Sequence, residues 1–207
     1  MKNKNDWWCF GEALDKETCK NIKNLNNREW EKAKINTGSG LIETHLKEGL
    51  YKRDDYHRVC DVSWTNEQWL YDLVWPYMET ANYSSGWRYD IKSAENMQIT
   101  RYKKKGFYGF HTDGEGDHLS VYDTPENNFK HGRVRKLSMS ILLNDSYEGG
   151  RFEISSYDKE KCTISAPEFN KAGSIIIFPS YTEHRVTPVT KGVRHSLVVW
   201  FLGPPFK

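Results

Sequence analysis

His111, Asp113, His184 and Arg194 are the residues of this chain whose types and spacing fit a defined chemistry. Two imidazoles and one carboxylate are the ligands of the facial triad that holds non-haem Fe(II) and leaves coordination positions open. An arginine shortly after the second histidine supplies the cation that a dicarboxylate ligand of the metal needs. These four residues therefore predict an iron site that uses 2-oxoglutarate.

The segment His111-Thr112-Asp113 is weak evidence by itself. Seven histidines in a chain of 207 residues with 28 acids should give about one His-x-acid pair by chance, and His111 is the only histidine with an acid two positions on. The prediction therefore depends on the elements that position these residues.

Short alternating runs, separated by Gly, Pro, Asn and Asp, make up the chain from residue 87 onward. They indicate strands over 87–91, 96–102, 107–113, 136–143, 151–155, 174–178, 184–189 and 193–202. Several short strands with no helical pattern between them predict an antiparallel sandwich or barrel. We therefore expect an α+β fold with a double-stranded β-helix (jelly-roll) core and N-terminal helices packed on one outer face.

Strand alternation brings the candidate metal ligands together. Side chains two apart in a strand point the same way, so a strand over 107–113 turns His111 and Asp113 to one side. His184 follows the apolar run 174–178 and the break at Pro179. We expect His184 at the mouth of the same barrel, distant in sequence but close in space.

The last expected strand has one face that suits a carboxylate. Arg194, Ser196, Val198 and Trp200 alternate onto the same side of this strand. An arginine turned into a barrel interior is costly without an anionic partner. The C5 carboxylate of 2-oxoglutarate would be that partner in bidentate geometry, with the Ser196 hydroxyl beside it.

The N-terminal part predicts two helices and an irregular stretch. Asp15 can cap a helix over 15–26, and a second helix is expected from Thr65, where Gln68 would complete a capping box. Pro76 should kink or interrupt this second helix, and the glycines and charges of 37–60 indicate irregular structure. We expect one domain over 1–207, with 1–86 as a mainly helical support and 87–203 as the jelly-roll catalytic core.

Composition disfavours several classes of partner. A net charge of +2 without a concentrated basic run makes nucleic acid an unlikely partner. No apolar run approaches the length of a membrane span, and none follows the N-terminus as in a signal peptide. The four cysteines are scattered without a CxxC spacing, which predicts a reduced, cytoplasmic setting.

The connection over 114–134 is long and has few apolar residues. Loops of this length in a compact domain are usually functional or disordered. A lid over the metal and a solvated surface insertion are both open interpretations.

The order of several short motifs resembles the prolyl 4-hydroxylase-like Fe(II)/2-oxoglutarate dioxygenases over roughly residues 87–203. The C-terminal motifs are Ile177-Phe178-Pro179-Ser180, His184-Arg185-Val186, Pro188-Val189, Gly192, Arg194, Ser196-Leu197 and Trp200. The upstream motifs are Gln98, Tyr102, His111-Thr112-Asp113, Arg135-Lys136-Leu137-Ser138, Leu143-Asn144-Asp145 and Tyr147-Glu148-Gly149-Gly150.

The resemblance implies a role for each matching residue. It implies His111, Asp113 and His184 as iron ligands. It also implies Arg194 as the partner of the C5 carboxylate, with Tyr102 and Ser196 assisting and Trp200 packed beside the site. Fe(II), 2-oxoglutarate and O2 would be the cofactor and cosubstrates, and ascorbate is a further candidate.

The implied activity is hydroxylation of a C–H bond with decarboxylation of 2-oxoglutarate to succinate. Relatives that halogenate need a small residue at the position of Asp113, so its carboxylate favours hydroxylation. The resemblance favours a prolyl residue in a peptide or protein as substrate, with a free amino acid or other small molecule also open. Two alternatives stay open: an oxygenase acting on nucleic acid or a modified base, and a non-catalytic metal-binding jelly-roll module. Trp200 disfavours the first, because nucleic-acid demethylases of the wider superfamily carry an arginine there.

Overall fold

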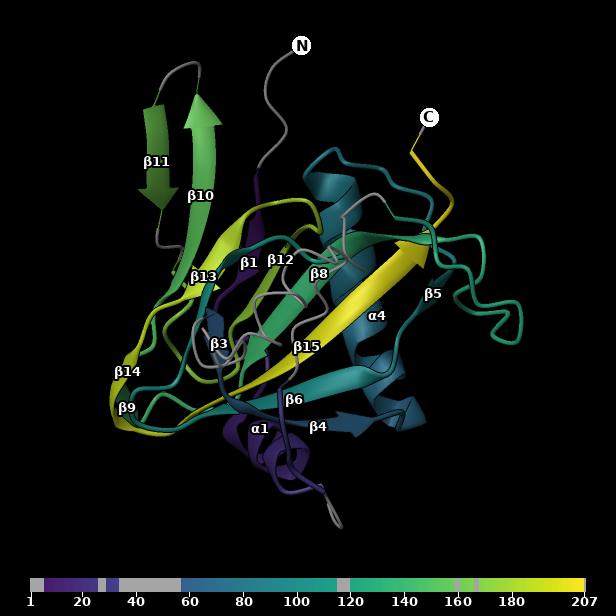
Figure 1. Ribbon diagram of the computed structural model, residues 1–207. Coiled ribbons are helices and arrows are strands. Elements are labelled where there is room, and N and C mark those ends of the chain that lie inside the picture. Colours follow the sequence, from purple (N-terminus) through teal and green to yellow (C-terminus); the bar gives the residue numbers. More distant parts are fainter. Residues whose placement is uncertain are drawn as a thin grey trace, which may run out of the picture.

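Two antiparallel sheets form most of the computed structural model, which describes residues 6–25, 29–33, 57–114, 120–158, 161–165 and 168–206. Figure 1 shows the two sheets with a long helix behind the larger one. The larger, eight-stranded sheet has the order β1 (Trp8–Phe10), β12 (Ile175–Pro179), β8 (Val134–Leu142), β15 (Arg194–Gly203), β6 (Met97–Tyr102), β4 (Asp61–Thr65) and β2 (Glu31–Lys32), and β5 (Ser93–Ala94) also pairs with β15.

The smaller sheet has five strands. Its order is β11 (Lys161–Ser165), β10 (Phe152–Asp158), β13 (His184–Val186), β7 (Phe107–His111) and β3 (Arg58–Val59). A separate two-stranded ribbon pairs β14 (Val189–Gly192) with β9 (Tyr147–Gly149). From β6 to β15 the chain crosses repeatedly between the two larger sheets, and this path gives the double-sheet jelly roll that the sequence predicted.

Period-two alternation divides the large sheet into two chemically different faces. On β15, Leu197, Val199 and Phe201 belong to the main hydrophobic core, whereas Arg194 and Ser196 line a cavity on the other face. Both faces are buried, as expected for a sheet covered on each side. The predicted division of this strand is confirmed, and it explains how an arginine is held inside the barrel.

Two helices contribute to the main core. The first, α1 (Lys16–Lys23), begins as predicted at Asp15, whose Oδ1 accepts a hydrogen bond from the Thr18 amide. The second, α4 (Gln68–Ser84), ends before Gly86, which has a φ of +75°. Buried side chains of both helices share one hydrophobic cluster with the large sheet: Cys19, Ile22, Leu70, Val74, Met78 and Ala81.

The predicted start of the second helix is wrong. Its N-cap is Glu67 without a side-chain hydrogen bond, and Thr65 is the last residue of β4 instead of a helix cap. The helix also continues through Pro76, so the expected interruption does not occur. Tertiary packing of α4 against the sheet outweighs these local signals.

The strand predictions differ from the structure at several points. Residues 87–91 form no strand, and β7 ends at His111, two residues short of the predicted end. The N-terminal part supplies β1, β2, β3 and β4, which were not predicted. Of the stretch 37–60, which was expected to be irregular, residues 37–56 lie outside the described residues and Arg58–Val59 form β3. Arg58 thus belongs to the edge strand β3 of the smaller sheet.

No helix within the described ranges is long and apolar enough to cross a membrane.

Candidate metal and 2-oxoglutarate site

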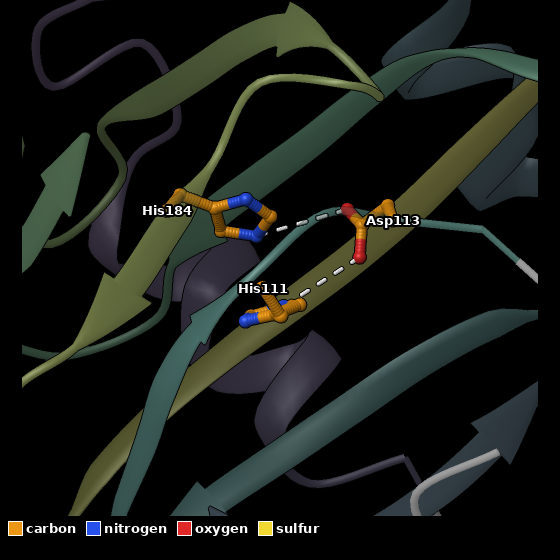
Figure 2. Close-up of side chains that lie close together, drawn as sticks. All are labelled: His111, Asp113 and His184. Atoms are coloured by element: carbon orange, nitrogen blue, oxygen red, sulfur yellow. Dashed lines mark ion pairs between the residues drawn. The ribbon is translucent and has the colours of Figure 1, made fainter. Parts of the chain in front are cut away.

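Three candidate metal ligands converge at the smaller sheet. His111 is the last residue of β7, Asp113 follows two residues later, and His184 begins β13. The Nε2 atoms of His111 and His184 lie 3.7 Å and 3.8 Å from the two carboxylate oxygens of Asp113, and the three ligand atoms all lie within 4.8 Å of one another. Figure 2 shows the three side chains directed toward a common point.

A β-bulge in β7 turns two aromatic rings toward this point. Along β13, His184 pairs with His111 and Val186 pairs with Tyr108, so two steps on one strand match three on the other. The extra residue places Tyr108 and His111 on the same side, and their rings stack with centroids 3.5 Å apart. Simple alternation does not predict this contact, because residues three apart lie on opposite faces of a regular strand.

Backbone carbonyls fix the orientation of both imidazoles. Nδ1 of His111 lies 2.9 Å from the Gly109 carbonyl oxygen, and Nδ1 of His184 lies 2.9 Å from the Thr182 carbonyl oxygen. A carbonyl only accepts, so each Nδ1 carries the proton and donates it. Each Nε2 is thereby left with its lone pair facing the other ligands, as a metal-binding histidine requires.

The protonation states also suit a cation. Burial and the neighbouring His184 lower the pKa of His111 to about 3, so its imidazole is neutral at pH 7. Burial alone would raise the pKa of Asp113, but His184 and His111 outweigh it and lower that pKa to about 2. A neutral imidazole beside an ionised carboxylate is the form in which such ligands bind a divalent metal.

The loop after β7 holds Asp113 in place. The Asp113 amide donates a hydrogen bond of 2.9 Å to the Ser180 carbonyl, which follows β12. Asp113 therefore reaches the site from beyond the strand end, and not through alternation within a strand as predicted. The predicted proximity to His111 holds, although the stated cause was wrong.

Arg194 is the most deeply buried cation of the site. Its side chain is 1% exposed, and no carboxylate in the described part of the chain pairs with it. Nη1 donates to the Ser196 hydroxyl at 3.1 Å, while the buried Nε has no hydrogen-bond partner among the described residues. A buried guanidinium with an unused donor fits a carboxylate ligand, because a charge is costly to bury unless it is paired.

One cavity of about 630 Å³ connects Arg194 with the three candidate ligands. Tyr102, Ser196 and Trp200 line it together with His111, Asp113 and His184, so the structure brings all seven predicted site residues together. The ring of Tyr102 lies 5.5 Å from the Arg194 guanidinium carbon. The indole N–H of Trp200 is buried and has no hydrogen-bond partner.

A second part of the cavity lining is built around Glu95, which is 4% exposed. Its carboxylate accepts hydrogen bonds from the Tyr122 hydroxyl at 2.7 Å, from Lys130 Nζ at 2.8 Å, and from Nε and Nη2 of Arg135 at 2.6 Å and 3.0 Å. The Arg135 guanidinium also lies 4.1 Å from the centre of the Trp200 ring. We refer to Glu95, Tyr122, Lys130 and Arg135 as the Glu95 cluster.

The Glu95 cluster bears on the two interpretations of the 114–134 connection. Residues 115–119 lie outside the described part, but Tyr122, Asn127 and Lys130 line the cavity. Three side chains of the segment 120–133 thus contribute to the cavity wall, while most of its other residues, His131 among them, are exposed.

Sequence reasoning missed Arg58 and Tyr108. Both line the cavity, and the Arg58 guanidinium lies 4.4 Å from the centre of the Tyr108 ring. The alternation of Cys60, Val62 and Trp64 with Asp61 and Ser63 would have indicated the neighbouring strand β4, but not the position of Arg58.

The chain matches a family model described as the 2OG-Fe(II) oxygenase superfamily over residues 97–202, which is more than half of its length. The chain belongs to the 2OG-Fe(II) oxygenase superfamily. Membership implies Fe(II), 2-oxoglutarate and O2 as the reacting partners, which agrees with the donor set and with the unpaired Arg194. This 2OG-Fe(II) oxygenase domain thus contains the candidate site that the sequence predicted.

Curated relatives of this oxygenase match about half of the chain or less. The PKHD-type hydroxylase YbiX of Escherichia coli O157:H7 is 33% identical over 106 residues, or 49% of this chain and 40% of that protein. A PKHD-type hydroxylase of Hyphomonas neptunium is 40% identical over 91 residues, or 42% of this chain and 38% of that protein. The match therefore spans less than half the length of these relatives.

Solved structures show the fold of this oxygenase over nearly the whole chain. A Pseudomonas putida prolyl-4-hydroxylase superimposes with a TM-score of 0.58 at 16% identity, covering 95% of this chain and 91% of its own. The viral collagen prolyl hydroxylase of Paramecium Bursaria Chlorella virus-1, in its 2OG complex, has a TM-score of 0.58 at 19% identity, covering 96% and 97%. These two structures confirm the jelly-roll core.

Proposed function

We propose that this protein is an Fe(II)- and 2-oxoglutarate-dependent hydroxylase. One observation carries the proposal: three ligand atoms of two histidines and an aspartate lie within 4.8 Å of one another, in a cavity that also holds a buried arginine without a carboxylate partner. A binding module without chemistry gives no reason to keep such an uncompensated cation beside a ligand triad.

His111, Asp113 and His184 would hold the metal, and Arg194 would bind the C5 carboxylate of 2-oxoglutarate. Fe(II), 2-oxoglutarate and O2, when bound, supply an oxidation that hydroxylates a C–H bond and yields succinate and CO2. The residues of the chain bind and orient. Ser196 accepts a hydrogen bond from Arg194 and so fixes its guanidinium, and the Tyr102 ring packs beside it. Trp200 closes the wall between this pair and the Glu95 cluster.

The substrate class is proposed from the relatives. The names of the curated relatives include the term hydroxylase, and the solved structures include prolyl hydroxylases, so we propose a prolyl residue in a peptide or protein, or a free amino acid. We also propose that 1–207 acts as one domain whose helices support the large sheet from outside, which the shared hydrophobic cluster supports. Ascorbate remains a predicted additive for the assay.

The test has an anaerobic and an aerobic step. Anaerobic addition of Fe(II) and 2-oxoglutarate should produce the visible charge-transfer band of the chelate, and admission of O2 should then yield succinate, measured with and without ascorbate. H184A and R194A should each lose the band, whereas H131A, changed at a partly exposed histidine outside the site, should keep it. A wild-type protein that gives neither band nor succinate would contradict the proposal.

A further inference from the structure

Arg58 is a second buried arginine without a carboxylate. It is 8% exposed, and among the described residues its side-chain contacts are a hydrogen bond from Nε to Cys60 Sγ at 3.1 Å and the Tyr108 ring at 4.4 Å. Several partly buried basic groups do have a carboxylate partner: Arg135 and Lys130 share Glu95, and Arg185 pairs with Glu153 at 2.7 Å. Within the described part of the chain, Arg58 is therefore a cation that no carboxylate neutralises.

The neighbours of Arg58 are neutral at physiological pH. Burial raises the pKa of the Cys60 thiol, so Cys60 offers a thiol and not a thiolate. Tyr108 meets the Arg58 guanidinium with the face of its ring, which carries no formal charge. A ring face and a thiol offset part of the cost of burying a guanidinium, but neither replaces its lost hydration as a carboxylate would.

The charge balance of the cavity gives the same result. Its described lining contains four permanent cations, Arg58, Lys130, Arg135 and Arg194, against two carboxylates, Glu95 and Asp113. A divalent metal and the dianion 2-oxoglutarate add equal and opposite charges, so the loaded site keeps its positive excess. Such an excess attracts an anion into the cavity.

The position of Arg58 is next to the site of the reaction. Its strand β3 pairs with β7, with Arg58 opposite Tyr108, and the Tyr108 ring stacks on His111 at 3.5 Å. Under the proposed function Arg194 is taken by the cosubstrate, and the Glu95 cluster satisfies Arg135 and Lys130. Arg58 is then the one arginine of the described lining left for another ligand.

We propose that Arg58 binds a carboxylate of the primary substrate, so that this enzyme selects an anionic substrate. The proposal rests on the proposed function, because it assigns Arg194 to 2-oxoglutarate. The carboxylate belongs either to a free amino acid or to an acidic peptide. In both cases a bidentate guanidinium–carboxylate contact fixes the substrate beside Tyr108.

The experiment compares matched ligands that differ only in this carboxylate. Calorimetry on protein loaded with Co(II) and 2-oxoglutarate measures binding of L-proline against L-prolinamide, and of the peptide Ac-Ala-Pro-Glu-NH2 against Ac-Ala-Pro-Gln-NH2. The variants are R58Q, R58K, and R88Q as a control, because Arg88 is an exposed arginine that also lies over a tyrosine ring, at 4.8 Å from the centre of Tyr83. Thermal melts confirm that each variant is folded.

The expected result is a preference of about tenfold or more for the carboxylate member of one pair in the wild type. R58Q abolishes this preference, R58K retains part of it, and R88Q leaves it intact. The pair that shows the preference identifies the source as amino acid or peptide.

Two results would overturn the proposal. One is a wild type without a carboxylate preference in either pair. The other is an R58Q variant that keeps the preference and loses affinity for 2-oxoglutarate, which would assign Arg58 to the cosubstrate. Because the measurement needs no turnover, failure of the proposed hydroxylation appears separately, as absent succinate formation by the wild type.

Discussion

Two parts of the cavity lining differ in how their buried charges are paired: the Glu95 cluster, and the region of Arg194 and the three candidate metal ligands. At the Glu95 cluster one carboxylate receives four hydrogen bonds from three side chains, so every partner comes from the chain itself. In another part of the lining, Nε of Arg194 has no hydrogen-bond partner among the described residues, and three potential metal-ligand atoms converge. A satisfied network gives a wall of fixed shape, whereas unsatisfied groups give affinity for ligands. Shape and chemistry are thus separated within one cavity.

The largest effect is expected when one of the three candidate metal ligands is removed. H184A removes one of three ligands, and since loss of a supporting residue alone costs 10- to 100-fold, metal affinity should fall by at least about a thousandfold. Calorimetric titration with Co(II) measures the change, with H131A as the matched control. An H184A variant that binds Co(II) as tightly as the wild type would contradict the assignment of His184 as a metal ligand.

Substitutions in the Glu95 cluster should lower the stability of the protein and leave its affinity for ligands unchanged. E95Q leaves the buried Arg135 without its anion, which should lower the free energy of unfolding by about 4 kcal/mol. Urea denaturation followed by circular dichroism measures this loss. E148Q, which breaks the exposed pair with Lys191, should cost about 0.5 kcal/mol or less.

The pH dependence of stability follows from the same group. Burial would raise the pKa of Glu95, but Arg135 and Lys130 outweigh it and hold the pKa below its ordinary value. The stabilisation is therefore complete above the ordinary carboxyl pKa of about 4.3 and is lost as pH falls through the lower pKa of the folded state. E95Q should flatten the wild-type loss of stability in that acidic range, and an unchanged profile would count against the assignment.

Substitution of Arg194 should have the opposite effects to substitution of Glu95: weaker ligand binding and a more stable protein. R194M should weaken binding of 2-oxoglutarate about 30- to 100-fold, because it removes a charge-assisted contact. The same change removes an unpaired buried cation, so the ligand-free variant should melt at a higher temperature than the wild type. Calorimetry and thermal melts test both parts, and R194K should fall between. A less stable R194M protein would show that Arg194 is already compensated by the fold.

The smallest effect is expected outside the cavity. Arg151 forms an ion pair with Glu153 at 3.1 Å, but its side chain is 71% exposed. R151A should therefore change the unfolding free energy by less than about 1 kcal/mol and leave metal binding unaltered. A larger change in the unfolding free energy or in metal binding would mean that Arg151 supports the cavity and is not merely a surface residue.

Side-chain chemistry on regular strands could be predicted from the sequence. The face of β15 that carries Arg194 and Ser196 follows from alternation alone, and so does its separation from Leu197 and Phe201. The start of α1 at Asp15 could also be predicted, because a capping carboxylate accepts a hydrogen bond from an amide only a few residues later in the chain.

Features that depend on pairing between distant segments could not be predicted. The bulge that turns Tyr108 and His111 to one side exists only against β13, and the Thr65 capping signal was overridden when that residue joined β4. Arg58 was missed for a related reason, since its strand is two residues long and is held only by its pairing with β7. Local patterns cannot report an element that is stabilised from outside.

The carbonyl contacts of His111 and His184 have an evolutionary consequence. In many metal sites a carboxylate side chain orients the histidine, and a single substitution can remove it. Here each acceptor is the main-chain oxygen two residues earlier, at Gly109 and Thr182. Every amino acid carries that oxygen, so point mutations at these two positions leave the acceptor in place. The orientation of the two imidazoles therefore depends on the course of the backbone and not on neighbouring side chains. Substitutions of those side chains can accumulate while the metal-ligand geometry is kept.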